Sequence, residues 1–450
     1  MIALLGVSAC GDDDDASAPD TVAEPADEPA DEPADEPADE PADEPADEPA
    51  DEPADEPADE PADEPADEPA DEPASEDLGT VSIGVIYSDD NPIYNSPTVR
   101  AGAEAAAFFL NEAGGVDGRT VEIVLCNDLS DPNEAALCVE ELIDADVDAV
   151  ISASLFDDLN IPVTTGAGIP HFPTVPNTPG GFTGENLFNV TAGVTQIVVG
   201  GLIAAENGID TVDMLTLESP VTPLLENLWA CGLAANGINE GARIIIPPTS
   251  QDFAPFVAQL SSGPAAGSQY FVPPVVIVPL GAAFSQSGIE NLIMTANGTI
   301  NAENLEQSGG ADTPYEGTIT FGPFPGPDNP VWADYYAAFE SSAPDMLGAV
   351  TNDQQAQAAW TAVMAMSSVI SSELAGTDVT SMSLSEALSS SAAVDTGGIT
   401  PPLDFTSTSD GPYGAIRNSA VYLARVTDGE LVPLNNDEPI DIADTLATCQ

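Results

Sequence analysis

The sequence predicts an α/β protein with two doubly wound, parallel-sheet lobes, preceded by a disordered acidic tether. Three observations support this. A four-residue repeat that cannot fold fills most of the first 78 residues. Short β-branched runs alternate with helical stretches from residue 79 onward, and this alternation is typical of a parallel sheet with helices on both faces. The alternation restarts after Asn186, and the 372 residues after residue 78 are about the length of two domains.

The chain is strongly acidic. It has 78 acidic residues against five basic ones, all arginine, for a formal net charge of −73. Of the acidic residues, 32 fall in residues 1–78, which leaves 46 acidic residues and five arginines, a net charge of −41, on the remainder. Such a chain repels phosphate, so we expect no binding to nucleic acid and no attraction to anionic lipid headgroups. A single histidine, His171, leaves little room for imidazole-based metal or acid–base chemistry.

The first ten residues form a short apolar run that ends in Val7-Ser8-Ala9-Cys10. This ending resembles the bacterial lipobox, in which small residues precede a cysteine that receives a lipid and becomes the mature N-terminus. The run is far shorter than the roughly 20 residues of a membrane-spanning helix and lacks a basic start. We therefore expect residues 1–10 to be the remnant of a lipoprotein signal and Cys10 to be the lipidated residue. The alternative is an incidental apolar start with one cysteine.

Residues 11–78 are expected to be the tether. Glu-Pro-Ala-Asp repeats run from Ala23 to Ala74, with a proline at every fourth position. Proline fixes φ and has no N–H, so neither a helix nor a sheet continues across it, and the two acidic residues of each repeat repel their neighbours. The segment should be an extended spacer that reaches on the order of 150 Å.

Residues 79–186 predict the first alternating unit. We expect strands at 80–87, 121–125, 147–151 and 169–172, because each is a short run rich in β-branched or aromatic residues. Helical stretches at 98–111 and 132–143 separate the first three strands. This order is that of βαβ units with a parallel sheet.

The second unit follows the same plan after Asn186. Helices are expected at 195–206 and 223–236, and strands at 212–217, 243–246 and 275–278, with one further helix before the last strand. The pattern therefore predicts a second doubly wound lobe.

Several segments of the folded part resemble one known family. They are 114–119 (Gly-Gly-Val-Asp-Gly-Arg), 121–124, 127–132 (Asn-Asp-Leu-Ser-Asp-Pro) and 149–152 (Ala-Val-Ile-Ser). Their order resembles that of the leucine/isoleucine/valine-type periplasmic binding proteins of ABC importers. Segments 188–193 and 402–405, with the strand expected at 420–426, resemble later parts of the same family. The resemblance covers nearly all of residues 79–435 and is most specific over the first 70 of them.

The resemblance implies the type I periplasmic binding protein fold, in which the chain crosses three times between two lobes through a three-strand hinge. Lobe 1 would comprise 79–194 plus 325–399, and lobe 2 would comprise 195–324 plus 400–450. It also implies a monomeric, lipid-anchored receptor on the outer face of the cell membrane, which captures a small molecule and delivers it to an ABC importer without a cofactor. One alternative is a ligand-sensing subunit of a signalling system. An enzyme on a similar scaffold is disfavoured, because no nucleophile elbow or phosphate-binding loop is present.

Four cysteines follow Cys10, and an even number in an exported protein indicates two disulfides. Cys126 ends an expected strand and Cys138 lies on the next helix, which folds back on that strand. We therefore favour Cys126–Cys138, which leaves Cys231–Cys449. Buried free thiols are the alternative. No Cys-x-x-Cys motif or Cys/His cluster supports a metal site.

Parallel sheets bind ligands at the carboxyl ends of their strands. In the family, loops after the third and fourth strands hold an amino-acid carboxylate and ammonium. The first-lobe candidates are accordingly Tyr94, Ser152, Ser154, Phe156, Thr174, Val175 and Asn177. The second-lobe candidates are Glu218, Val221, Leu280 (in a turn over 280–282) and Asn297. For Thr174 and Asn177 the alternative is a structural role, in which they cap their own turn. His171 is either a contact at the wall of the ligand cleft or a buried, hydrogen-bonded histidine.

Two of these positions depart from the family pattern. The tyrosine that the family has in the first loop of lobe 2 falls near Val221, and the acidic residue that pairs with the ligand ammonium falls near Asn297. A buried ammonium without a carboxylate is costly. The sequence therefore leaves an amide, a short carboxylate or an amino acid open as the ligand.

Overall fold

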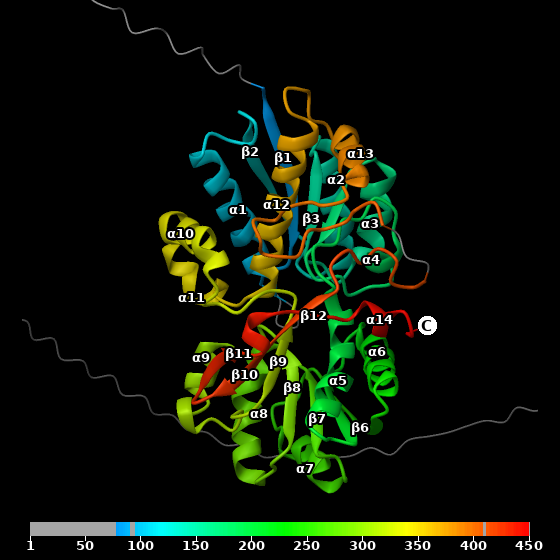
Figure 1. The fold of residues 1–450 in the computed structure, drawn as a ribbon, viewed down its shortest axis with the longest axis vertical. Coiled ribbons are helices and arrows are strands. Elements are labelled where there is room, and N and C mark those ends of the chain that lie inside the picture. The colour runs from blue at the N-terminus through cyan, green and yellow to red at the C-terminus, as the bar shows by residue number, and fades with distance from the viewer. Residues whose placement is uncertain (1–77, 91–94, 408–410, 450) are drawn as a thin grey trace, which may run out of the picture. The chain divides into compact units, whose positions relative to one another are not determined.

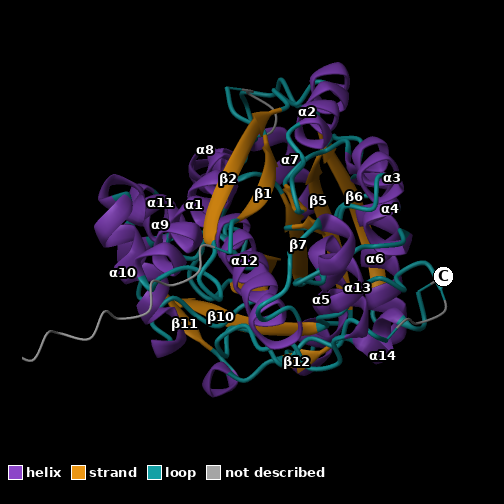
Figure 2. Ribbon diagram, turned by 90° about the horizontal axis from the view of Figure 1, so that it is seen from above, coloured by secondary structure: helices purple, strands orange, loops and turns teal. Residues whose placement is uncertain are grey.

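The computed structural model describes residues 78–90, 95–407 and 411–449. The expected signal remnant with Cys10, all of the expected tether except residue 78, and Tyr94 lie outside these ranges. The described residues form two sheets with helices packed on their faces (Figures 1 and 2).

The first sheet is parallel throughout and has the strand order β2-β1-β3-β4. The strands are β1 (Thr80–Tyr87), β2 (Thr120–Asn127), β3 (Ala149–Ser152) and β4 (His171–Pro173). The intervening helices are α1 (Pro97–Glu112), α2 (Pro132–Asp144) and α3 (Asp157–Gly166). The order and type of the elements predicted for this half are confirmed, and α3 is an additional helix. Helix α2 begins where expected because the Asp131 side chain accepts from two backbone N–H groups of its first turn, and Pro132 has no N–H to lose.

Alternation along β1 explains the layers of this lobe. Val81, Ile83 and Val85 pack into the cluster that contains α1 and α12 (Gln354–Glu373), whereas Ile86 packs with α2 on the other face. Successive side chains of a strand point to opposite faces, so one strand supplies both layers. Both faces of the sheet are thereby covered, as parallel sheets require.

The second sheet has the order β11-β10-β9-β8-β7-β5-β6. Its parallel strands are β5 (Thr211–Leu217), β6 (Asn239–Ile246), β7 (Gly267–Phe271), β8 (Leu292–Ala296) and β9 (Ile319–Gly322). β10 (Ala420–Thr427) runs antiparallel to β9, forms a hairpin with β11 (Glu430–Pro433) and pairs with β12 (Ile440–Asp441). The larger helices of this half are α5 (Val199–Glu206), α6 (Thr222–Ala235), α7 (Ala254–Ser262) and α8 (Pro274–Ser287).

Shorter elements complete the chain. The remaining helices are α4 (Gly180–Thr183), α9 (Ala302–Gln307), α10 (Ala333–Ser342), α11 (Leu347–Val350), α13 (Ser381–Ser390) and α14 (Ala443–Leu446). The 3₁₀ segments are Gly193–Val198, Gly310–Asp312, Pro330–Trp332, Pro344–Met346 and Asn435–Asp437.

The strand predicted at 275–278 is wrong. These residues form the first turns of α8, and the strand that precedes them is β7. A buried apolar run fits a strand and a buried helix equally well by periodicity. Pro274, at the first position of α8, has a φ suited to a helix start. Residues 280–282, predicted to be a turn at the site, consequently lie inside α8.

The hydrophobic clusters show where the chain passes between the two sheets. Val190 packs with the first sheet and Ala192 with the second, and the chain returns between Phe321 and Phe324. Leu403 and Phe405 still belong to the core of the first sheet, so the lobe boundary predicted at residue 400 is too early. The resemblance of 402–405 to a hairpin segment suggested the second lobe for these residues, whereas the structure packs Leu403 and Phe405 on the first.

The two predicted disulfide pairings are those of the structure. Cys126, the penultimate residue of β2, is bonded to Cys138 of α2. Cys231 of α6 is bonded to Cys449, which fastens the C-terminal residues to the second lobe.

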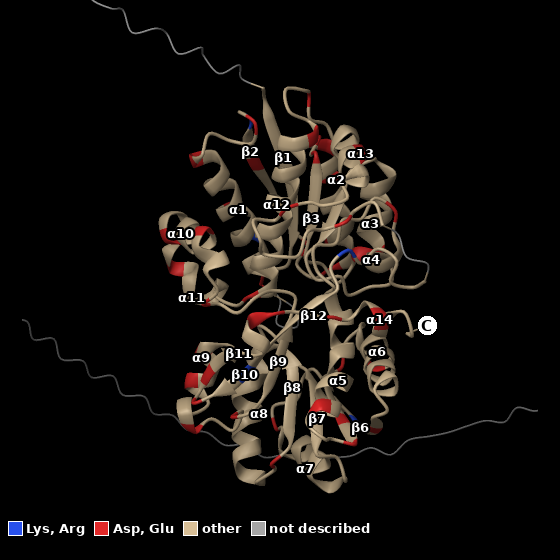
Figure 3. Ribbon diagram, viewed as in Figure 1, with Lys and Arg blue, Asp and Glu red and all other residues tan. Residues whose placement is uncertain are grey.

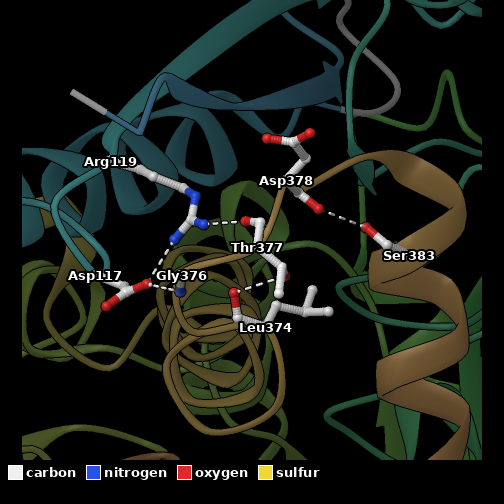
Figure 4. A network of polar contacts seen from close by, with 7 residues as sticks. All are labelled: Asp117, Arg119, Leu374, Gly376, Thr377, Asp378 and Ser383. Atoms are coloured by element: carbon white, nitrogen blue, oxygen red, sulfur yellow. Dashed lines mark hydrogen bonds and ion pairs between the residues drawn. The ribbon is translucent and has the colours of Figure 1, made fainter. Parts of the chain in front are cut away.

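Arg119 links two distant parts of the first lobe (Figure 4). It is 1% exposed and forms an ion pair of 2.9 Å with Asp117, while its other terminal nitrogen donates to the Thr377 carbonyl. The Asp117 carboxylate also accepts from the Gly376 N–H at 2.8 Å, and this bond, together with Arg119, lowers the pKa of Asp117. The turn before β2 is thus held to the connection between α12 and α13. Arg119 is buried and its guanidinium contacts the protein itself, so its role is structural.

Candidate functional site

A cavity of about 250 Å³ lies where the carboxyl ends of strands from both sheets meet. Leu155 follows β3, and Val175 and Asn177 follow β4. From the second sheet, Leu217 ends β5, Phe271 ends β7 and Ala296 ends β8. Ligands of doubly wound sheets bind at this edge. Larger hollows of about 400 Å³ beside Arg417 and about 740 Å³ beside Pro162 lie away from it.

The lining is apolar with a few amide groups. Among the described residues that border the cavity, none is charged. Its polar side chains include four carboxamides, those of Asn177, Gln196, Gln354 and Gln355, and the hydroxyl-bearing Ser219, Tyr270 and Thr299. An apolar pocket with a small number of polar groups is typical of a small-molecule site.

Three helices begin at this cavity. Val221 and Pro273 flank the first turns of α6 and α8, and Gln354 and Gln355 open α12. Helix N-termini favour negative charge through their free N–H groups. Several of these N–H groups are missing or used here: α6 and α8 have proline in their first two positions, and the Asp353 carboxylate caps α12 by accepting from Ala356 N at 2.8 Å. Burial raises the pKa of Asp353. The helix ends therefore offer little to an anion.

The amide groups are connected in a relay. The Gln354 side chain donates from Nε2 to the backbone carbonyl of Asn297 at 3.1 Å. Gln196 in turn donates from its Nε2 to Oε1 of Gln354 at 3.2 Å. Oε1 of Gln196 and Oδ1 of Asn177 are buried and have no hydrogen-bond partner among the described residues.

The structure brings three of the predicted site residues to the cavity: Val175, Asn177 and Val221. Thr174 stands behind them, 1% exposed, with its hydroxyl 3.0 Å from the Ser152 carbonyl and 2.5 Å from Oε1 of Gln355. Asn297 contributes its backbone carbonyl to the relay and does not border the cavity.

The other predicted positions that the structure describes do not border the cavity. Ser154 donates to Asp128 at 2.5 Å, and Phe156 precedes the first turn of α3. The backbone N–H of Glu218 bonds to Ile246, which extends the pairing of β5 with β6. Leu280 is wrong as a ligand contact: it is fully buried among the apolar side chains that α8 presents to the sheet.

Ser152 and His171 belong to a buried polar cluster. Nε2 of His171 lies 2.8 Å from the Ser152 hydroxyl, and Nδ1 lies 2.8 Å from the Thr164 hydroxyl. Burial lowers the pKa of His171 to about 3, so the ring is neutral. Nearby, burial raises the pKa of Asp157 to about 7. The histidine is therefore a hydrogen-bonded core residue, which was the structural alternative.

Sequence reasoning missed Gln196, Tyr270, Phe271, Gln354 and Gln355. Tyr270 and Phe271 were missed because the strand that ends with them, β7, was expected at 275–278. Asp353 before an alanine-rich helical run is a typical N-cap, and it could have placed Gln354 and Gln355 at a helix start. No local sequence pattern could have placed Gln196 at the cavity, because its position follows from the way the chain crosses between the lobes.

Two further properties concern the described ranges as a whole. They contain no group of three or more His, Cys, Asp or Glu side chains arranged to hold a metal ion. No helix in them is long and apolar enough to cross a membrane.

Comparison with solved structures gives matches over most of the chain. A fatty acid ABC transporter substrate-binding protein from Thermomonospora curvata is 16% identical, with a TM-score of 0.66 over 82% of this chain and 94% of that one. A leucine-binding protein from Thermotoga maritima is 19% identical, with a TM-score of 0.64 over 81% of this chain and 100% of the other. A solute-binding protein of an ABC transporter from R. palustris, in complex with benzoate, is 15% identical, with a TM-score of 0.64 over 81% and 98% of the two chains. At these identities the likeness shows the fold.

Comparison with curated proteins by sequence gives no match. The model of one protein family, described as periplasmic binding protein, matches residues 80–430, which include the whole first sheet, β5 to β10 of the second and the residues that border the cavity. The chain therefore belongs to the periplasmic binding protein family.

Proposed function

We propose that the protein is an extracytoplasmic receptor that captures a small metabolite between its two lobes and delivers it to an ABC importer. One observation carries the proposal: an uncharged cavity is bordered by strand ends of both sheets, so a ligand there contacts both lobes at once. Closure of two lobes around such a ligand is a common mechanism in binding proteins. Membership in the family favours binding over catalysis.

The partner and the location complete the proposal. Several similar structures are described as ABC transporter substrate-binding proteins, which supports an importer as the recipient of the ligand. Family membership implies a location outside the cytoplasm. Cys10 would carry the lipid anchor, and the acidic repeat would be the spacer between the membrane and the receptor.

Ligand capture can be tested with the full chain. We would measure the thermal unfolding midpoint in the presence of amino acids, amides and short carboxylates, since a ligand that binds only the folded state raises the midpoint in proportion to its concentration. A Val221→Trp variant, which fills the cavity, should abolish the shift. Val163→Trp, on an exposed part of α3, is the matched control and should preserve it. Shifts that survive Val221→Trp would contradict the proposed site.

The anchor needs a separate experiment. Cys10→Ala, expressed behind a complete secretion signal, should move the protein from the membrane fraction to the soluble fraction. Deletion of residues 23–74 with Cys10 intact is the control, and that protein should stay in the membrane fraction. Retention of the Cys10→Ala protein in the membrane fraction would refute lipid anchoring.

A further inference from the structure

We infer that the ligand is an uncharged molecule with an apolar body and an N–H or O–H donor group, such as a carboxamide, and that Gln196 and Asn177 accept from this donor. The inference rests on the proposed function and narrows its ligand class. It follows from the orientation of the amide relay, the burial of two acceptor oxygens and the uncharged lining of the cavity.

The relay has a fixed direction. Its first acceptor is the backbone carbonyl of Asn297, which cannot donate. The Gln354 side chain must therefore turn its NH₂ group toward Asn297, and its own oxygen becomes the acceptor for the NH₂ group of Gln196. This order leaves Oε1, and not Nε2, as the unpaired end of Gln196. The usual ambiguity between amide oxygen and nitrogen is thus resolved by a backbone group.

On two residues that border the cavity, a buried acceptor is left without a donor from the described part of the protein. Gln196 is 2% exposed and Asn177 is 9% exposed, and both border the cavity. The oxygens Oε1 and Oδ1 of these residues are buried and have no partner in the described part of the chain, so a ligand reaches them once the two side chains shift toward the cavity. A buried polar group without a partner is unfavourable, so a ligand that donates to these oxygens gains more than one that does not.

Charged ligands fit the cavity less well. A carboxylate would meet acceptor oxygens, and the helix ends nearby have proline in place of N–H groups at Pro223 and Pro274. An ammonium group would find no carboxylate among the described residues of the lining. Burying either charge without compensation is costly. A neutral donor avoids both penalties.

The rest of the lining sets the shape of the ligand. Leu155, Val175, Leu217 and Ala296 present apolar atoms from four strand ends. Their contacts favour an aliphatic or aromatic body.

The test uses sets of probes that share one apolar body and differ in the head group. One set is 4-methylpentanamide, 4-methylpentanoate and 3-methylbutylamine, and the second is benzamide, benzoate and benzylamine. Binding to the full chain is measured by titration calorimetry and by the thermal midpoint. In at least one set the amide should bind at least tenfold more tightly than the carboxylate and the amine. A carboxylate or an amine that binds as tightly as the amide in both sets would overturn the inference.

Substitutions test the named acceptors. Gln196→Met keeps the length of the side chain and removes the acceptor, so amide affinity should fall by roughly 5- to 150-fold. Gln196→Glu keeps an acceptor and adds a negative charge, so the affinity for the amine should rise relative to the affinity for the amide. Gln259→Glu, the same change on the exposed face of α7, is the control and should alter neither affinity. Asn177→Asp repeats the charge test from the other lobe, in case a Gln196 variant does not fold.

The outcomes separate the two proposals. If charged probes bind and the Gln196 and Asn177 variants leave head-group preference unchanged, the receptor function stands and the neutral-donor inference fails. If no probe of any head group shifts the midpoint, and the broader panel of amino acids, amides and carboxylates also fails, both proposals fail.

Discussion

The hydroxyl of Thr174 lies 2.5 Å from Oε1 of Gln355 and thereby joins the loop after β4 to the first turn of α12. These residues are 181 positions apart in the sequence. Gln355 borders the cavity and Thr174 does not, so the threonine acts on the site through the glutamine. Asn177, three residues further along the loop, borders the cavity directly. One short loop thus contains a residue that borders the cavity and a residue that holds another cavity-bordering side chain in place.

The first prediction separates these two roles. Thr174→Val removes a buried hydroxyl that bonds to Ser152 and Gln355, so the free energy of unfolding without ligand should fall by about 1–3 kcal/mol. Asn177→Ala removes a carboxamide that borders the cavity. It should therefore weaken ligand binding and lower the stability of the unliganded protein by less than Thr174→Val does. Denaturant unfolding and calorimetry measure the two effects. An unchanged stability of Thr174→Val would contradict its supporting role.

The second prediction concerns the disulfides. The bond between Cys231 and Cys449 closes a loop of 218 positions, and the bond between Cys126 and Cys138 closes one of 12. In the loop-entropy model the longer loop contributes about 5 kcal/mol and the shorter about 3 kcal/mol. Replacing Cys449 and Cys231 by serine should therefore lower stability more than the same change at Cys126 and Cys138. Denaturant midpoints of the two double variants give the comparison, and the reverse order would count against the model.

The sequence predicted the first lobe far better than the site. Strand β1 and helix α2 can be predicted from local sequence, because β1 is a β-branched run and α2 begins with Asp-Pro. Gln196 and Gln354 come together only because the chain crosses between lobes, and no local pattern encodes that contact. Leu280 failed for a different reason: the apolar run before it satisfies the periodicity of a strand as well as that of a buried helix. Loop residues such as Asn177 were predicted because the ends of parallel strands are restricted to one edge of a sheet.

The third prediction is a pH effect of Asp157. Burial raises the pKa of Asp157 from an ordinary value of 3.8 to about 7, so the folded state holds the proton more tightly than the unfolded chain does. The contribution of this group to stability is therefore greatest below about pH 4 and is lost as the pH rises to about 7. Asp157→Asn should gain stability over the parent through this interval, up to about 4 kcal/mol on the plateau.

Unfolding of both proteins is compared at several pH values, so that the opposite effect of His171, which is neutral when buried, cancels in the difference. Asp210→Asn, at an exposed position, is the control and should give a flat difference. A flat difference for Asp157→Asn would show that its pKa is not raised.

The fourth prediction concerns salt. Acidic residues are spread over the helices and loops of the described chain, and few basic residues lie among them (Figure 3). The ion pairs in this part of the protein involve only Arg100, Arg119 and Arg243. With a net charge of −41 after residue 78, repulsion within the folded state destabilises it, and the more extended unfolded chain relieves that repulsion.

Added salt screens this repulsion, because the Debye length falls from about 10 Å at 0.1 M to about 3 Å at 1 M. The unfolding midpoint should therefore rise with NaCl concentration, steeply at first and then less, as the screening length drops below the spacing of the charges. Exclusion of a solute from the protein surface would instead give a rise that continues in proportion to concentration, and sucrose provides that comparison. Removing charge should act like adding salt: a variant with several exposed acidic residues changed to their amides should start from a higher midpoint and respond less to NaCl. A midpoint that stays flat or falls between low salt and 1 M NaCl would mean that self-repulsion does not limit the stability of this protein.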